Sequence, residues 1–166
     1  MSRDEKICAF IEAFCLIPEG AKVGKPIKLM DFQKKFILDV FDNPDGTSRA
    51  YLSVARKKGK TVLIAAIVLA RLVGPEAKQN SQIISGARSR DKASLVFKLA
   101  EKMIRLSPNL SKMVRIIPSQ KTLIGLICNV KYRAVSAEGG TAHGLSPRLT
   151  ILDEISQVRG PHDAFI

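Results

Sequence analysis

The sequence predicts a three-layer α/β domain built on a largely parallel sheet. Apolar residues recur at helical spacing in several segments, and short apolar runs of strand length alternate with them. Turn signals rich in Gly, Pro, Asn and Asp separate the two kinds of segment. Strands that alternate with helices favour a parallel sheet covered by helices. The chain has 166 residues, which suits one domain with a sizeable core.

Helices are expected at four apolar stripes, and turn or cap residues bound most of them. Pro18 ends the first, Gly74 ends the third, and Ser89 or Asp91 caps the fourth. The helical segments are residues 7–17, 29–41, 61–73 and the segment around 96–103. Strands are expected at residues 49–54, 81–85, Val114–Ile117, 122–128, 131–135 and Leu149–Leu152.

The charge balance favours a polyanionic partner. Lys and Arg number 27 against 15 acidic residues, which gives a formal net charge of +12. Clustered cations gain affinity for a nucleic acid by releasing counterions from its phosphates. Many basic chains bind no nucleic acid, so charge alone does not decide the point.

The cysteines indicate a reducing compartment. Cys8, Cys15 and Cys128 are odd in number and form no CxxC pair. If their segment is helical, Cys8 and Cys15 lie roughly 10 Å apart along the axis, which is too far for a disulfide. We therefore expect reduced thiols in a cytoplasmic protein.

No membrane role is expected. The apolar stretch 7–17 is interrupted by Glu12 and preceded by acidic residues, whereas a signal peptide has a basic start and an unbroken apolar run. The apolar run 61–73 is too short to span a bilayer and contains Arg71.

A basic loop between the strand at 49–54 and the helix at 61–73 has the setting of a phosphate-binding loop, the Walker A motif or P-loop. Backbone N–H groups at a helix start face phosphate oxygens, and the helix dipole adds positive potential. Gly59 lets the backbone approach the phosphates without a Cβ in the way. Lys60 would reach the β- and γ-phosphates, and the Thr61 hydroxyl would ligate Mg²⁺. The loop residues are Val54, Ala55, Arg56, Lys57, Lys58, Gly59, Lys60 and Thr61.

One position departs from the usual P-loop pattern. That pattern has a glycine five residues before Gly59, where this chain has Val54. A solvated basic turn is therefore an alternative interpretation of this loop.

A second motif supports nucleotide binding. The apolar strand Leu149–Leu152 is followed at once by Asp153 and Glu154. Open α/β sheets bind their ligands at the carboxyl ends of their strands. Asp153 would hold the Mg²⁺ shell as a Walker B acid does, and Glu154 would orient and deprotonate the attacking water. The alternative is an ordinary acidic helix cap. The presence of a P-loop upstream in the same domain favours the Walker B interpretation over that alternative.

Taken together, the motifs resemble the N-terminal ATPase region of the large terminase subunit of tailed bacteriophages, the motor that packages DNA into proheads. The resemblance covers about residues 25–154, and the order of its parts and the Arg-containing P-loop are specific to that family. The parts are residues 29–33, 45–46, 56–61, 90–93, 143–147 and 153–154.

The resemblance implies further roles. Gln33 matches a glutamine that reads adenine, because an amide both donates to and accepts from the base edge. Arg56 matches a P-loop arginine suited to contact the γ-phosphate as charge builds on it. Without the family, Gln33 would be taken as a surface residue of an amphipathic helix. Arg56, Lys57 and Lys58 would be a solvated loop or a DNA contact. His143 is taken as structural and left out of the catalytic set.

The family also implies cofactors, partners and a longer chain. ATP and Mg²⁺ would be the ligands, and double-stranded DNA, the small terminase subunit and the portal protein the partners, in the host cytoplasm. Active family members assemble as homo-oligomeric rings. They continue past the Walker B strand with a further core strand, expected between the two Walker strands, and a nuclease domain. We expect residues 1–166 to form one incomplete P-loop ATPase domain, with 1–46 as an N-terminal helical segment on the adenine side. We expect it to hydrolyse ATP poorly alone.

The sequence thus predicts an ATPase that drives translocation of double-stranded viral DNA. One alternative is a helicase-type ATPase, which shares a glutamine motif, a P-loop and an Asp-Glu strand. Another is a basic remnant that binds nucleotide or nucleic acid without turnover.

Overall fold

The computed structural model describes residues 2–41, 60–87, 90–136 and 149–152. Within them the helices are α1 (Arg3–Phe14), α2 (Asp31–Phe41), α3 (Lys60–Val73), α4 (Arg90–Leu106), α5 (Pro108–Met113) and the short 3₁₀ helix η1 (Pro118–Gln120). The strands are β1 (Gln82–Ala87), β2 (Val114–Ile117), β3 (Thr122–Gly125), β4 (Val130–Ser136) and β5 (Leu149–Leu152).

The described strands form one mixed sheet in the order β2-β3-β4-β1-β5. β1 lies parallel to both of its neighbours, β4 and β5, so the carboxyl ends of these three strands share one edge. β2, β3 and β4 pair antiparallel, because the short segments that connect them cannot make a parallel crossover. The α/β prediction is confirmed, with the parallel part confined to β4, β1 and β5.

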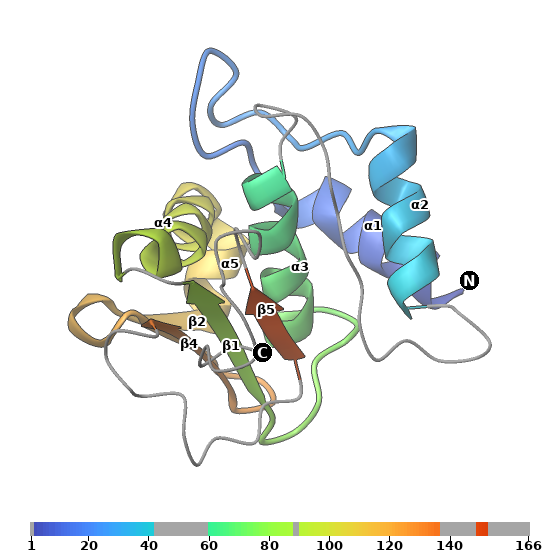
Figure 1. The fold of residues 1–166 in the computed structure, drawn as a ribbon. Coiled ribbons are helices and arrows are strands. Elements are labelled where there is room, and N and C mark those ends of the chain that lie inside the picture. Colours follow the sequence, from blue (N-terminus) through green and yellow to red (C-terminus); the bar gives the residue numbers. More distant parts are fainter. Residues whose placement is uncertain (1, 42–59, 88–89, 137–148, 153–166) are drawn as a thin grey trace, which may run out of the picture.

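Helices α3 and α4 contact each other and both contact β4, so they cover the same face of the sheet. α1 packs on α3, and α2 packs on α1 (Figure 1). The described residues therefore show a sheet, a helical layer on one face, and an outer helical pair. The second helical face of the three-layer prediction is not represented among these elements.

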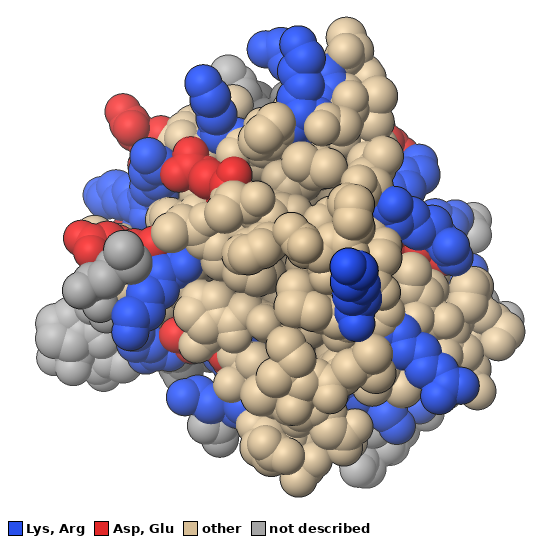
Figure 2. All heavy atoms as spheres, turned by 180° about the vertical axis from the view of Figure 1, so that it is seen from behind, with Lys and Arg blue, Asp and Glu red and all other residues tan. Residues whose placement is uncertain are grey.

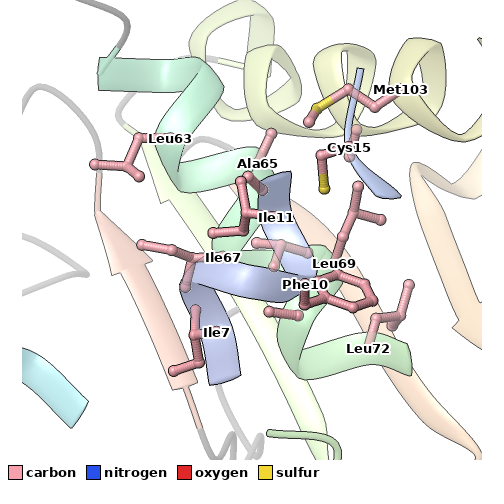
Figure 3. Packing of buried hydrophobic residues seen from close by; sticks show 14 of the residues in the cluster. Ile7, Phe10, Ile11, Cys15, Leu63, Ala65, Ile67, Leu69, Leu72 and Met103 are labelled. Atoms are coloured by element: carbon pink, nitrogen blue, oxygen red, sulfur yellow. The ribbon is translucent and has the colours of Figure 1, made fainter. Parts of the chain in front are cut away.

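The core is centred on α3, which is buried on nearly all sides. Its small side chains let α1 approach closely, and in Figure 3 Ile7, Phe10 and Ile11 of α1 lie against the leucines and isoleucine of α3. Met103 reaches the same cluster from α4. The buried residues of α3 are Leu63, Ala65, Ala66, Ile67, Val68, Leu69, Ala70 and Leu72.

Several boundaries differ from the sequence-based ones for local physical reasons. α1 begins at Arg3, because the Ser2 N–H donates to Glu5 Oε2 at 3.2 Å and caps the helix. β3 ends at Gly125, because the following turn contains Asn129 at a φ of 53°. α5 was not anticipated, and the Ser107 hydroxyl caps it by accepting from the Leu110 N–H at 3.3 Å. The strand expected at 49–54 lies outside the described residues.

The structure describes all three cysteines. Cys8, Cys15 and Cys128 are all free, and the first two are buried. Burial raises the pKa of the Cys15 thiol to about 12, so this side chain behaves as a small apolar residue. Among the helices that the structure describes, none has the length and apolar character to cross a membrane.

Candidate nucleotide-binding site

The candidate site is the place where the start of α3 meets the carboxyl edge of the parallel strands. α3 begins at Lys60, and β5 ends at Leu152, directly before Asp153. In Figure 1 the start of α3 lies toward the same end of the fold as the arrowheads of β1 and β5. The topology therefore brings the start of α3 and the end of β5 toward one edge of the sheet, where open α/β sheets bind their ligands.

The helix start has the local chemistry that an anion requires. The first backbone N–H groups of a helix have no partners within it, and the dipole gives that end a partial positive charge. No acidic residue occupies the first turn of α3. Thr61, in that turn, is half-buried. These features are compatible with an anion at the helix start. The loop residues 54–59 lie outside the described residues, so the P-loop and the solvated basic turn both stay predictions.

The other predicted site residues divide into two groups. Gln33 is described in full and lies on α2. The remaining positions fall outside the described residues, so their predicted roles stay predictions. These are Arg56, Lys57, Lys58, Gly59, Asp153 and Glu154.

Gln33 has a structural role that the sequence analysis did not identify. Its side chain is only 7% exposed, so it is not the surface residue that the local pattern alone indicated. Its Oε1 atom accepts the Met30 N–H at 2.8 Å and so caps the start of α2. Within the part of the chain that the structure describes, no acceptor engages Nε2. Gln33 thus holds its own helix start with the amide oxygen and keeps the amide donor for another partner.

The far end of α3 is fixed by an ion pair from the N-terminus. Arg3 donates to both carboxylate oxygens of Glu76, at 3.0 and 2.8 Å, in a two-pronged contact between α1 and the segment after α3. Burial raises the pKa of Glu76, but the Arg3 hydrogen bond and charge, with Arg71 and Lys78, outweigh burial and lower it. Arg71 also lies over the Phe41 ring, 5.7 Å from its centroid. These contacts tie α1 and α2 to the C-terminal end of α3.

The β3–β4 turn region closes on the same end of α3. A Cβ added to Gly125 would lie 2.3 Å from the backbone oxygen of Leu72, so only glycine allows this approach. The sheet and the helix are therefore in backbone contact where α3 ends. Together with the Arg3–Glu76 pair, this contact leaves the helix little freedom to slide relative to the sheet.

A buried polar pair fixes the centre of the sheet. Ser85 of β1 and Tyr132 of β4 share a hydrogen bond of 2.5 Å between their hydroxyl groups. Burial raises the pKa of Tyr132 well above its usual range, so the phenol stays neutral. A buried hydroxyl pair of this kind favours one register of β1 on β4. β1 in turn pairs with β5.

Comparison with known proteins is consistent with this geometry. The family model "Terminase large subunit, ATPase domain" matches residues 31–162. This chain belongs to that family. It is 63% identical over all 166 residues to a protein described as "Terminase, large subunit" of Enterobacteria phage HK97, of which it covers 33%.

A solved structure agrees with the family match. The crystal structure of the HK97 bacteriophage large terminase matches with a TM-score of 0.91 and 61% sequence identity, over 99% of this chain and 34% of that one. The chain thus spans about a third of the length of the terminases it matches. The predicted resemblance to large terminase subunits is confirmed, and the family match sets the helicase-type alternative aside.

Proposed function

We propose that this terminase domain binds ATP with Mg²⁺ and hydrolyses it to drive double-stranded DNA into a viral prohead. The observation that supports the proposal is that α3 begins, at Lys60, toward the same end of the sheet at which β5 ends. In the sequence Asp153 and Glu154 follow β5 directly. The family membership supports the same assignment.

Each residue has a distinct task in this proposal. Lys60 and the backbone N–H groups at the start of α3 hold the β- and γ-phosphates. Arg56 contacts the γ-phosphate as negative charge builds on it, with Lys57 and Lys58 beside it in the loop. Glu154 accepts a proton from the attacking water.

A Mg²⁺ ion fits this edge because the donors offered there are oxygen atoms, from the Thr61 hydroxyl and the Asp153 carboxylate. Thr61 is half-buried on the first turn of α3, where its hydroxyl would serve as one of these donors. The ion, when bound, neutralises charge on the phosphate oxygens. Gln33 would use its Nε2 donor on the adenine edge while its Oε1 caps α2.

The partners proposed for the whole protein are double-stranded DNA, the small terminase subunit and the portal protein, with several copies in a ring. The place of action would be the host cytoplasm at the portal vertex. These assignments rest on the family, whose relatives are about three times as long as this chain.

The test of nucleotide binding compares one site variant with a matched control. Lys60→Ala should weaken binding of a fluorescent ATP analogue roughly 10- to 100-fold, the value of one charge-assisted hydrogen bond. Lys112→Ala removes an exposed lysine from α5 and should leave affinity unchanged. Equal affinity of wild type and both variants would contradict the P-loop assignment.

Turnover is tested separately, in the full-length protein that contains this domain. Glu154→Gln should keep ATP binding and lower phosphate release about 10²- to 10⁴-fold, because the amide cannot accept the proton. If wild-type protein binds ATP and releases no phosphate with DNA present, the non-catalytic alternative is the correct one.

A further inference from the structure

The segment between α1 and α2 forms a hydrogen-bonded projection, which we call the basic hairpin (residues 15–28). Leu16 and Pro26 form an antiparallel bridge. The Ile17 N–H donates to the Lys25 carbonyl at 2.8 Å, and the Gly24 N–H donates back to the Ile17 carbonyl at 2.9 Å. The hairpin projects at the upper end of the view in Figure 1, away from the sheet.

The tip of the hairpin is open, although its base is fixed. Residues 19–26 are all exposed. Gly20 and Gly24 have φ values of 95° and 86°, which glycine adopts without strain, and no atom lies within 4 Å of a Cβ built on either. At the base, Cys15 is fully buried and Ile27 is 8% exposed. The hairpin is therefore an ordered surface feature with a solvated end.

Two side-chain contacts hold the hairpin against the helices. Glu19 forms an ion pair with Lys102 of α4. Glu12 of α1 accepts the Leu29 N–H at 3.3 Å, just after the hairpin ends. The first contact joins the hairpin to α4, and the second joins the residue that follows the hairpin to α1.

The hairpin carries an unbalanced positive charge. Lys22, Lys25 and Lys28 are exposed, and none pairs with a carboxylate in the described ranges. The one acid of the hairpin, Glu19, is already compensated by Lys102. Figure 2 shows lysine and arginine side chains at the upper end and around the margins of the face opposite to the one seen in Figure 1.

Two more exposed lysines follow the hairpin in the sequence, on α2. Lys34 and Lys35 are exposed in the first half of that helix, and neither pairs with a described carboxylate. Asp31 is the one acid between Lys28 and Lys34. The hairpin and α2 thus present five lysines from one stretch of chain.

We infer that the basic hairpin binds the phosphate backbone of duplex DNA, an inference that rests on the proposed function. In an extended arm, Lys25 and Lys28 are separated by roughly 10 Å of chain. Since a DNA strand carries a phosphate every 3.4 Å or so along the axis, the two lysines reach different phosphates. Lysine is a point charge that accepts any backbone orientation, so the contact would be independent of sequence, as a translocating motor requires.

A second basic surface provides a matched control. Arg115 of β2 and Lys131 and Arg133 of β4 are exposed, and the strand register places all three on the sheet face opposite α3 and α4. These residues are on strands of the sheet, whereas the lysines of the basic hairpin are on a projecting loop. The triple variant Arg115→Ala, Lys131→Ala, Arg133→Ala removes the same charge as Lys22→Ala, Lys25→Ala, Lys28→Ala.

The experiment measures binding of this chain to two unrelated duplexes by fluorescence anisotropy over a salt series. The affinity for DNA decreases with salt, and the plot of log K against log salt should become less steep by about 0.9 for each phosphate that a variant no longer neutralises. At roughly 0.1 M salt, each lost phosphate contact should weaken binding about eightfold. The hairpin variant should therefore bind between about 8-fold and 500-fold more weakly, for one to three phosphates, on both duplexes alike. A Lys→Arg triple at the same positions should bind as wild type does.

The outcomes separate this inference from the proposed function. Wild type that binds neither duplex at low salt would contradict the DNA part of the proposed function, and this inference with it. Two outcomes would overturn the hairpin assignment alone. One is a hairpin variant with the DNA affinity of wild type, and the other is an equal loss of DNA affinity in the hairpin and sheet-face variants. Unchanged ATP-analogue affinity and melting temperature show that a variant has kept the fold. If the alanine triple unfolds, the triple Lys22→Gln, Lys25→Gln, Lys28→Gln, which keeps the length of the side chains and removes their charge, should lose the same affinity, and wild-type affinity in it would overturn the hairpin assignment.

Discussion

Replacing Gly125 with alanine tests the backbone contact that holds the sheet to the end of α3. Gly125 pairs with Val130 of β4 and Val114 of β2, so it is fixed from both sides. An added Cβ would lie 2.3 Å from the Leu72 carbonyl oxygen and 3.2 Å from a methyl group of Val73. The nearest atom belongs to a helix backbone, which cannot rotate away as a flexible side chain can.

The magnitude follows from two opposing effects. Gly→Ala stabilises by about 0.4–1 kcal/mol through the unfolded chain where the native backbone accepts alanine. Relieving the contact requires the strand or helix to move by roughly 1 Å, because non-bonded heavy atoms rest near 3.5 Å. Overpacking of this kind costs about 1–3 kcal/mol and at times more. Because the clash is with helix backbone, we expect a cost near the upper value, about 3 kcal/mol, and a net destabilisation of about 2–2.6 kcal/mol. The melting temperature should therefore fall by about 4–10 °C for a domain of this size.

The assay is thermal unfolding followed by circular dichroism, with denaturant unfolding as a second measure. Leu126→Ala is the control, because the neighbouring side chain is 57% exposed and its removal should change the free energy of unfolding by about 0.5 kcal/mol or less. Gly125→Ala that is as stable as wild type, or more stable, would refute the close approach of β3 to α3.

Two further predictions concern single side chains. Glu76→Gln should lower stability at neutral pH by about 1–3 kcal/mol, the value of hydrogen bonds to a charged group. Because the pKa of Glu76 is lowered from 4.5 in the folded state, its contribution is present above that value and lost as the pH falls through the folded-state pKa. Unfolding measured from neutral to acid pH should show the variant and wild type converging, and a constant difference would contradict the ion-pair account. Gln33→Glu keeps an acceptor for the Met30 N–H, so stability should hold, but it loses the amide donor proposed for adenine. Competition of ATP and GTP for the same site should show reduced preference for ATP, and an unchanged preference would remove Gln33 from the site.

The local pattern was enough to predict most of the elements. β2 and β5 have the predicted bounds, and α3 begins one residue from the predicted start. These segments are short apolar runs between strong turn signals, so local preference and burial agree. The direction in which the strands pair was harder to predict than the strands themselves. β2, β3 and β4 were predicted as strands, but not their antiparallel pairing, which follows from connections of only four residues.

Contacts between distant residues were not predictable from the pattern. Arg3 and Glu76 are 73 residues apart, and each alone is an ordinary surface charge in the sequence. The approach of Gly125 to Leu72 likewise depends on how two elements pack. For the candidate site, the sequence predicted a helix start at Thr61, one residue after the observed one, and the strand before Asp153, but not that Gln33 caps α2. The signal that could have found this role is the capping pattern, a glutamine three residues after the cap position.

The central claim is that nucleotide phosphates lie at the start of α3, beside the end of β5. The most direct measurement is a map of backbone amide chemical shifts in this chain, with and without Mg²⁺ and a non-hydrolysable ATP analogue. We expect the largest changes at Lys60 and Thr61 and at the residues that follow Leu152, and little change in the β2–β3 hairpin. Largest changes at the exposed lysines of the basic hairpin, with none at the start of α3, would contradict the account.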